Sequence, residues 1–109
     1  MRVELRAESR EVAEVLRGYV ERRLRFALGR FGSRVGHVLV TISRNGRAHT
    51  GCRITTDIVP FGSVVVKEVD FDLFAAIHRA TARAGRLFGR ELERLRDARI
   101  TRESVRMAA

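Results

Sequence analysis

The first residues of the chain alternate between apolar and charged side chains, with Val3 and Leu5 set among arginines and glutamates. A period of two residues is typical of a half-buried strand, here over residues 2–7. The spacing becomes helical after Ser9, which favours the N-cap of a helix, and the helix is expected to end at Gly32. The apolar positions of this first helix are Val12, Val15, Leu16, Tyr19, Leu24, Ala27, Leu28 and Phe31.

The middle of the chain returns to the period of a strand. Residues 38–42 and 52–58 both alternate, and the Asn45-Gly46 sequence between them is typical of a tight hairpin turn. The sequence Pro60-Phe61-Gly62 interrupts the pattern before a third apolar run at residues 64–69. These segments predict an antiparallel meander of three strands.

A long second helix is predicted over residues 71–97, with Asp70 or Asp72 as the cap at its start. Residues 98–109 lack a sustained pattern, so we expect a basic, flexible tail after a single domain formed by residues 1–97. The apolar face of the helix consists of Leu73, Ile77, Ala80, Ala84, Leu87, Phe88 and Leu95.

The order of the predicted elements is β-α-β-β-β-α. The first β-α-β step allows its two strands to lie parallel through a right-handed crossover. Both helices are amphipathic, and a single sheet has to cover the two apolar stripes. The expected fold class is therefore α+β, a two-layer sandwich with two helices packed on one face of a four-stranded mixed sheet.

The charge of the chain is strongly positive. Twenty-two basic residues face thirteen acidic ones, which gives a formal net charge of +9 in 109 residues, and every basic residue except Lys67 is an arginine. A codon-usage bias would explain arginine in place of lysine, but it would not explain the excess of positive charge. That excess indicates a polyanionic partner, a nucleic acid first and an anionic membrane surface second.

Several classes of function are disfavoured. The lone cysteine, Cys52, allows neither an intrachain disulfide nor a multi-cysteine metal site, and we expect it to be a small buried side chain. The histidines His37, His49 and His78 fall on different elements, and no catalytic motif is present. We therefore expect no catalysis, cofactor, metal or small-molecule substrate. The sequence also lacks a signal segment and a membrane-spanning run, so a cytoplasmic protein is expected.

The second helix carries a row of like charges that we call the arginine ridge. Its members fall within an arc of roughly 80° and extend over about 22 Å of helix. A run of charges is usually a solvated helix face, but such faces mix signs and this one repeats the same sign. Neighbouring like charges on a helix repel, and the phosphates of RNA or DNA would offset that repulsion, so the ridge favours contact with a nucleic acid. The arginine ridge consists of Arg79, Arg83, Arg86, Arg90 and Arg94.

Two further features near the arginine ridge each have two explanations. On the first helix, Arg22 and Arg23 form a second basic cluster. Arg23 either extends its guanidinium into water at the helix edge or lies in the groove between the helices, facing the ridge. On the second helix, Gly85 and Gly89 allow either close packing on the first helix or close approach of a partner. An exposed His78 beside the ridge would add at most a pH-dependent phosphate contact.

With these features in place, the chain resembles the bacterial ribosome hibernation-promoting factor and ribosome-associated inhibitor A family, also called the sigma-54 modulation protein family. The resemblance covers residues 2–96. It rests on two stretches, the first-helix sequence Leu16-Arg17-Gly18-Tyr19-Val20-Glu21-Arg22-Arg23-Leu24 and the second-helix start Asp72-Leu73-Phe74-Ala75-Ala76-Ile77-His78.

The resemblance implies a partner and an activity. Such proteins bind ribosomal RNA of the small subunit in the decoding region, where messenger and transfer RNA lie, and stabilise idle 70S ribosomes in stationary phase or stress. They do this without catalysing a reaction and without binding a membrane. The chain is similar to the short forms, which lack a dimerisation domain, and a monomer is expected off the ribosome. The implied RNA contacts are Arg22, Arg23, Arg79, Arg83, Arg86 and Arg90, to which the ridge adds Arg94.

Two other functions stay open at this point. A sheet backed by two helices is also the layout of general double-stranded-RNA-binding modules. Alternatively, the exposed sheet face around Arg53, Thr55 and Lys67 would serve a small protein-interaction adaptor. Departures from the family pattern include His78 in place of aspartate and Phe74 in place of tyrosine.

Overall fold

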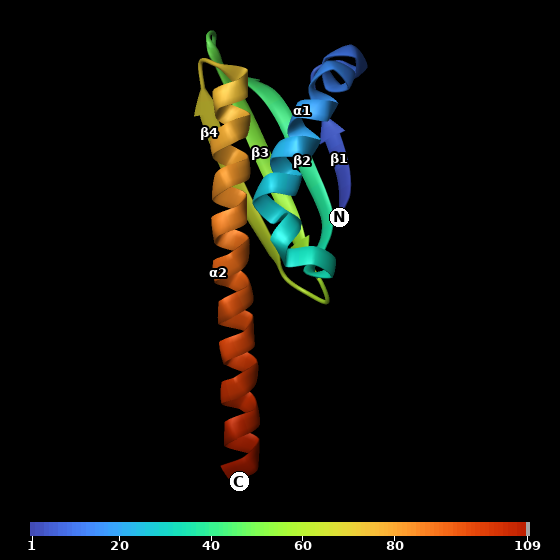
Figure 1. Cartoon of the computed structure of the whole chain (residues 1–109). Helices are drawn as coiled ribbons and strands as arrows, with labels where there is room; N and C mark the ends of the chain where they lie inside the picture. Colours follow the sequence, from blue (N-terminus) through green and yellow to red (C-terminus); the bar gives the residue numbers. More distant parts are fainter. Residues whose placement is uncertain (109) are drawn as a thin grey trace.

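The computed structural model describes the backbone of residues 1–108 and the side chains of residues 1–44 and 46–99. Figure 1 shows two helices lying side by side against a sheet, with the second helix extending well beyond it. The elements in chain order are strand β1 (Arg2–Arg6), helix α1 (Arg10–Leu28), the 3-10 segment η1 (Gly29–Arg34), strands β2 (Val35–Asn45), β3 (His49–Ile58) and β4 (Ser63–Asp70), and helix α2 (Leu73–Ala108).

The sheet has the order β1-β2-β3-β4. β1 pairs parallel with β2, because α1 returns the chain to the same end of the sheet, and the other two pairings are antiparallel. The hairpin between β2 and β3 turns at Gly46, whose φ of 83° suits glycine. The predicted two-layer α+β fold, with both helices on one face of a mixed sheet, is confirmed.

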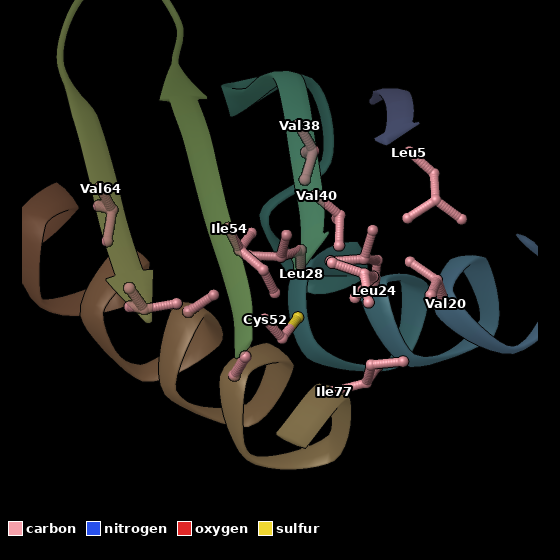
Figure 2. Close-up of a cluster of buried hydrophobic side chains, with 14 of the residues drawn as sticks. Leu5, Val20, Leu24, Leu28, Val38, Val40, Cys52, Ile54, Val64 and Ile77 are labelled. Carbon is pink, nitrogen blue, oxygen red and sulfur yellow. The ribbon is translucent and has the colours of Figure 1, made fainter. Parts of the chain in front are cut away.

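The core lies between the sheet and the helices. Figure 2 shows Val40 and Ile54 extending from the strands toward Leu24 of α1 and Ile77 of α2. All four side chains are fully buried, and they belong to one continuous apolar cluster. Cys52 is part of the same cluster, and burial raises the pKa of its thiol to about 12. The cysteine is therefore a small core residue, as predicted, and stays protonated at neutral pH.

Helix α1 begins as predicted but differs at two points. The Ser9 side chain caps it by accepting a hydrogen bond from the Val12 backbone N–H, at 3.2 Å. The predicted end at Gly32 is wrong, because the α-helix ends at Leu28 and Gly32, with a φ of 55°, lies within η1. The predicted burial of Val15 is also wrong.

The buried stripe of α1 runs four residues apart, through Leu16, Val20, Leu24 and Leu28. Val15 is 81% exposed because it lies about 100° around the helix from Leu16, away from this stripe. The first turn of the helix, which holds the partly exposed Val12, lies at the margin of the sheet.

Helix α2 is capped as predicted and is longer than predicted. The Asp72 carboxylate accepts a hydrogen bond from the Phe74 backbone N–H at 3.0 Å. The helix continues to Ala108, so the expected end at Asp97 is wrong. Residues 98–108 contain no glycine or proline that would stop it. Residue 109 and the side chains from residue 100 onward lie outside the described part of the chain, and a flexible tail over residues 98–109 stays a prediction.

Two glycines of α2 lie close to the segment formed by α1 and η1. A Cβ atom at Gly85 would lie 2.7 Å from the backbone carbonyl oxygen of Ala27 in α1. At Gly89 a Cβ atom would lie 3.2 Å from the ring of Phe31. Gly85 therefore allows α1 and α2 to pack in direct contact, and Gly89 allows η1 to pack on α2. Of the two explanations that the sequence left open, close packing applies at both positions.

Replacing Gly85 with alanine tests this contact. The added methyl group meets backbone, which cannot move aside as a side chain can, and such overpacking costs about 1–3 kcal/mol. Alanine recovers roughly 1 kcal/mol of helix propensity. Gly85→Ala is thus expected to lower the free energy of unfolding by up to about 2 kcal/mol, measured by urea titration.

Gly18→Ala is the matched control. Its Cβ atom would meet the far end of the flexible Arg22 side chain at 3.3 Å, on the exposed side of α1. This variant is expected to be as stable as the original chain or up to about 1 kcal/mol more stable. Equal effects of the two substitutions would show that the helices do not make the described contact.

Candidate nucleic-acid interface

The arginine ridge follows one flank of α2. Counting about 100° per residue, it lies roughly 130° around the helix from the buried row formed by Ile77, Ala80, Ala84 and Phe88. All five arginines are exposed, as the sequence predicted. The ridge runs along the side of α2 that is next to the edge strand β4, as the contacts of its first two arginines show.

Arg79 connects α2 to β4. Its guanidinium forms a 2.5 Å ion pair with the Asp70 carboxylate and donates a 2.7 Å hydrogen bond to the backbone carbonyl of Val69. Its Nε atom lies 3.8 Å from the Glu68 carboxylate. These contacts hold the start of the helix against the end of the strand, so Arg79 has a clear structural role.

Two more arginines of the ridge have acidic partners within the chain. Arg83 lies 3.5 Å from Glu68, the carboxylate that Arg79 also approaches. Arg94 forms an ion pair with Glu91, one helical turn earlier, at 2.5 Å. The repulsion expected within the ridge is therefore partly offset by Glu68, Asp70 and Glu91. Sequence reasoning had not foreseen the first two of these, which come from the neighbouring strand.

Arg86 and Arg90 differ from the other three. Both are exposed, and among the described residues neither forms an ion pair or a hydrogen bond with an acidic side chain. They lie four residues apart in the middle of the helix, about 6 Å along its axis. The excess positive charge of the ridge is therefore concentrated at these two side chains.

The basic cluster of α1 includes an aromatic residue that sequence reasoning missed. Arg22 is exposed, and the guanidinium of Arg23 lies 5.3 Å from the centroid of the Phe26 ring. The Arg23 Nε atom is buried without a hydrogen-bond partner among the described residues. Phe26 is 81% exposed. Phe26 lies outside the apolar stripe of α1, and this position in the sequence was the signal that would have identified it as an exposed aromatic residue.

The acidic groups paired with the ridge are stabilised in their charged forms. The backbone N–H of Asp72, followed by the Arg79 guanidinium, lowers the pKa of Asp70 below its ordinary value. The Arg94 guanidinium likewise lowers the pKa of Glu91. Both carboxylates remain ionised at neutral pH, so Arg79 and Arg94 keep their partners there.

The three histidines lie on different elements, β2, β3 and α2. His37 lies 3.3 Å from Glu4, His49 stacks on Phe71 with ring centroids 4.0 Å apart, and His78 is exposed. Residues 1–99 contain no cluster of three or more histidine, cysteine or acidic side chains placed to hold a metal ion.

A search of the described helices found none long and apolar enough to cross a membrane.

The fold and this surface define a class of protein, a small basic α+β domain whose helix layer carries exposed arginines, two of them without an acidic partner among the described residues. The comparisons with known proteins identify the family. The chain belongs to the family described as sigma 54 modulation protein / S30EA ribosomal protein, whose model matches residues 3–96. The family resemblance expected from the two helix sequences is thus confirmed.

Two solved structures are similar to this chain. One is the N-terminal domain of Protein Y from Thermus thermophilus, with 32% identity, a TM-score of 0.69 and coverage of 83% of this chain and 98% of that one. The other is described as a ribosomal subunit interface protein from Coxiella burnetii, with 9% identity, a TM-score of 0.71 and coverage of 85% and 99%. The second likeness shows a shared fold. A search of curated proteins found no match.

The contacts of Asp70 predict a dependence of stability on pH. Because the pKa of Asp70 is lower in the folded chain than in the unfolded one, the ionised carboxylate stabilises the fold above its unfolded pKa. This contribution is lost as the pH falls through the folded pKa. Asp70→Asn removes the titrating group, so its melting temperature is expected to fall less between pH 7 and pH 3 than that of the original chain.

The measurement is a series of thermal unfolding curves across this range of pH. Asp57→Asn serves as the control, because Asp57 is an exposed aspartate of β3 outside these contacts. If the Asp70 and Asp57 variants show the same pH dependence, Asp70 does not stabilise the junction between β4 and α2.

Proposed function

We propose that this protein binds the ribosomal RNA of the small ribosomal subunit through the outer surface of its two helices. We further propose that it occupies the decoding region, where messenger and transfer RNA lie, and holds idle ribosomes inactive under stress. The observation that carries the proposal is the pair of exposed arginines, Arg86 and Arg90, which have no acidic partner among the described side chains, on a helix of a ribosomal family member.

The chemistry of these side chains suits RNA. A guanidinium presents a planar set of donors that binds two phosphate oxygens at once, and it stays charged at any physiological pH. The exposed ring of Phe26 offers a surface on which an unpaired base stacks. Arg22 and Arg23 add positive charge on either side of it. Phosphate binding and base stacking together favour a folded RNA over a simple polyanion.

The paired arginines contribute less to this attraction. Arg79 and Arg83 face the two carboxylates of Glu68 and Asp70, so the four groups together carry no net charge. Arg94 is neutralised by Glu91 in the same way. We therefore assign the phosphate contacts first to Arg86 and Arg90, and assign Arg79 mainly to the stability of the fold.

The description of the family, S30EA ribosomal protein, supports a ribosomal site. One protein of similar fold is described as a ribosomal subunit interface protein. The net charge of +9 fits a partner rich in phosphate groups, such as ribosomal RNA. In this proposal the protein acts in the cytoplasm as a monomer, by occupying a site, without catalysis or a cofactor.

Reversing the charge of the two unpaired arginines tests the proposal. Arg86→Glu/Arg90→Glu is expected to weaken co-sedimentation with small ribosomal subunits at least tenfold and to reduce the salt dependence of binding by about two log-log units. The melting temperature should change little, because neither side chain has an acidic partner within the described chain.

Arg44→Glu/Arg47→Glu is the matched control, since it changes the net charge equally at exposed positions of the β2–β3 hairpin. The control is expected to sediment with the subunits almost as well as the original chain. Equal loss in the two double variants would mean that overall charge, and not this part of α2, carries the binding. Preference for free duplex RNA over small subunits would instead favour a general double-stranded-RNA binder.

A further inference from the structure

A second basic surface lies on the other side of α2 from the arginine ridge. Where α2 leaves the body of the domain, an open groove of about 890 Å³ separates it from η1 and from the turn between β3 and β4. Figure 1 shows this turn and η1 at the same end of the domain, beside the helix. None of the ridge arginines lines the groove.

The groove is positively charged and partly apolar. Its floor includes Leu92 and Leu95 of α2, both half-buried. Glu93 is its acidic lining residue. The basic side chains around it are Arg30, Arg34, Arg96 and Arg99. An excess of arginine around an apolar floor is suited to a ligand that carries both negative charge and flat apolar groups.

An aromatic ring stands at the rim of the groove. Phe61 lines it from the β3–β4 turn and is 69% exposed, so the ring contributes little to the core. The turn itself is held firmly. The Ile58 backbone N–H donates to the Gly62 carbonyl at 2.8 Å, and the Arg34 Nε atom donates to the Val59 carbonyl at 2.7 Å.

The second aromatic residue of the groove has a different role. Phe31 packs on the buried Phe88, with ring centroids 4.8 Å apart, and Arg30 lies over its ring at 4.7 Å. Phe31 therefore anchors η1 and positions Arg30 at the groove, while Phe61 is the ring left open to a ligand.

We propose that this groove binds a segment of single-stranded RNA, with a base stacked on Phe61 and the adjoining phosphates on Arg30 and Arg96. Aromatic rings and arginines along a groove are the usual means of binding unpaired strands, since each base has a face to stack and each link has a phosphate. A duplex does not satisfy this site because its bases are already stacked on one another. The inference extends the proposed function by adding an unpaired strand to the RNA bound through the helices, and it rests on separate residues.

The test is the binding of a fluorescently labelled ten-nucleotide oligoadenylate to the full chain, followed by anisotropy. Phe61→Ala is expected to weaken binding about tenfold, the typical loss when a stacked base loses its aromatic partner. Phe71→Ala is the control, because Phe71 is 71% exposed and lies at the opposite end of β4. Its affinity should stay within about twofold of the original chain. Equal affinities of the Phe61 and Phe71 variants would overturn the inference.

Charge reversal provides a second variant that does not depend on the ring. Arg96→Glu is expected to lower the salt dependence of oligoadenylate binding by about one log-log unit. Arg47→Glu changes the net charge equally at the far hairpin and should leave that dependence nearly unchanged. Tighter binding of a ten-base-pair duplex than of the single strand would contradict the inference.

The same measurements separate this inference from the proposed function. Arg86→Glu/Arg90→Glu is expected to keep most of its affinity for oligoadenylate while losing small subunits. If this double variant loses oligoadenylate and Phe61→Ala keeps it, single strands bind at the arginine ridge and the groove is not their site. If Phe61→Ala loses oligoadenylate and the double variant still binds small subunits, the groove is supported and the ridge proposal fails.

Discussion

The arrangement of this protein depends on the direct contact between its two helices at Gly85 and Ala27. A side chain at position 85 would meet the α1 backbone carbonyl at 2.7 Å, so the helices can lie this close only with glycine there. The buried row that includes Ile77 and Phe88 sets the rotation of α2 over the sheet. Together these contacts decide that the arginine ridge faces outward, along the flank next to β4.

The electrostatics of the helix layer divide its arginines by role. Arg79 joins α2 to the end of β4 through Asp70 and the Val69 carbonyl, and the lowered pKa of Asp70 reflects part of that contact. Arg86 and Arg90, by contrast, are exposed without an acidic neighbour in the described structure. The stabilising contacts are thus at the start of the helix and the free charge is in its middle, so the RNA binding that we propose is separable from folding.

Hydrophobic periodicity was sufficient to predict the strands, both helices and the two-layer fold, because burial on one sheet face imposes those periods. The predicted burial of Val15 was wrong because this residue lies about 100° around α1 from the buried stripe. The predicted end of α1 was wrong because the chain changes to the 3-10 segment η1 at Gly29, which hydrophobic spacing does not distinguish from an α-helix. The acidic residues of other elements that pair with the arginine ridge could not be predicted at all. Glu68 comes within reach of Arg83 only through the packing of α2 on β4. The groove beside Phe61 likewise forms only when the β3–β4 turn meets the extended helix.

The central claim is that the outer surface of the helix layer, and not the open face of the sheet, contacts small-subunit RNA. Directed cleavage of that RNA by an iron chelate tethered to an introduced cysteine tests it, because the buried native Cys52, with a thiol pKa of about 12, resists labelling. Ala82→Cys places the chelate between the ridge and α1, and Thr55→Cys places it on the sheet face, both at half-exposed positions. The account predicts cleavage in the decoding region from position 82 and little from position 55. Strong cleavage from position 55, with none from position 82, would contradict it.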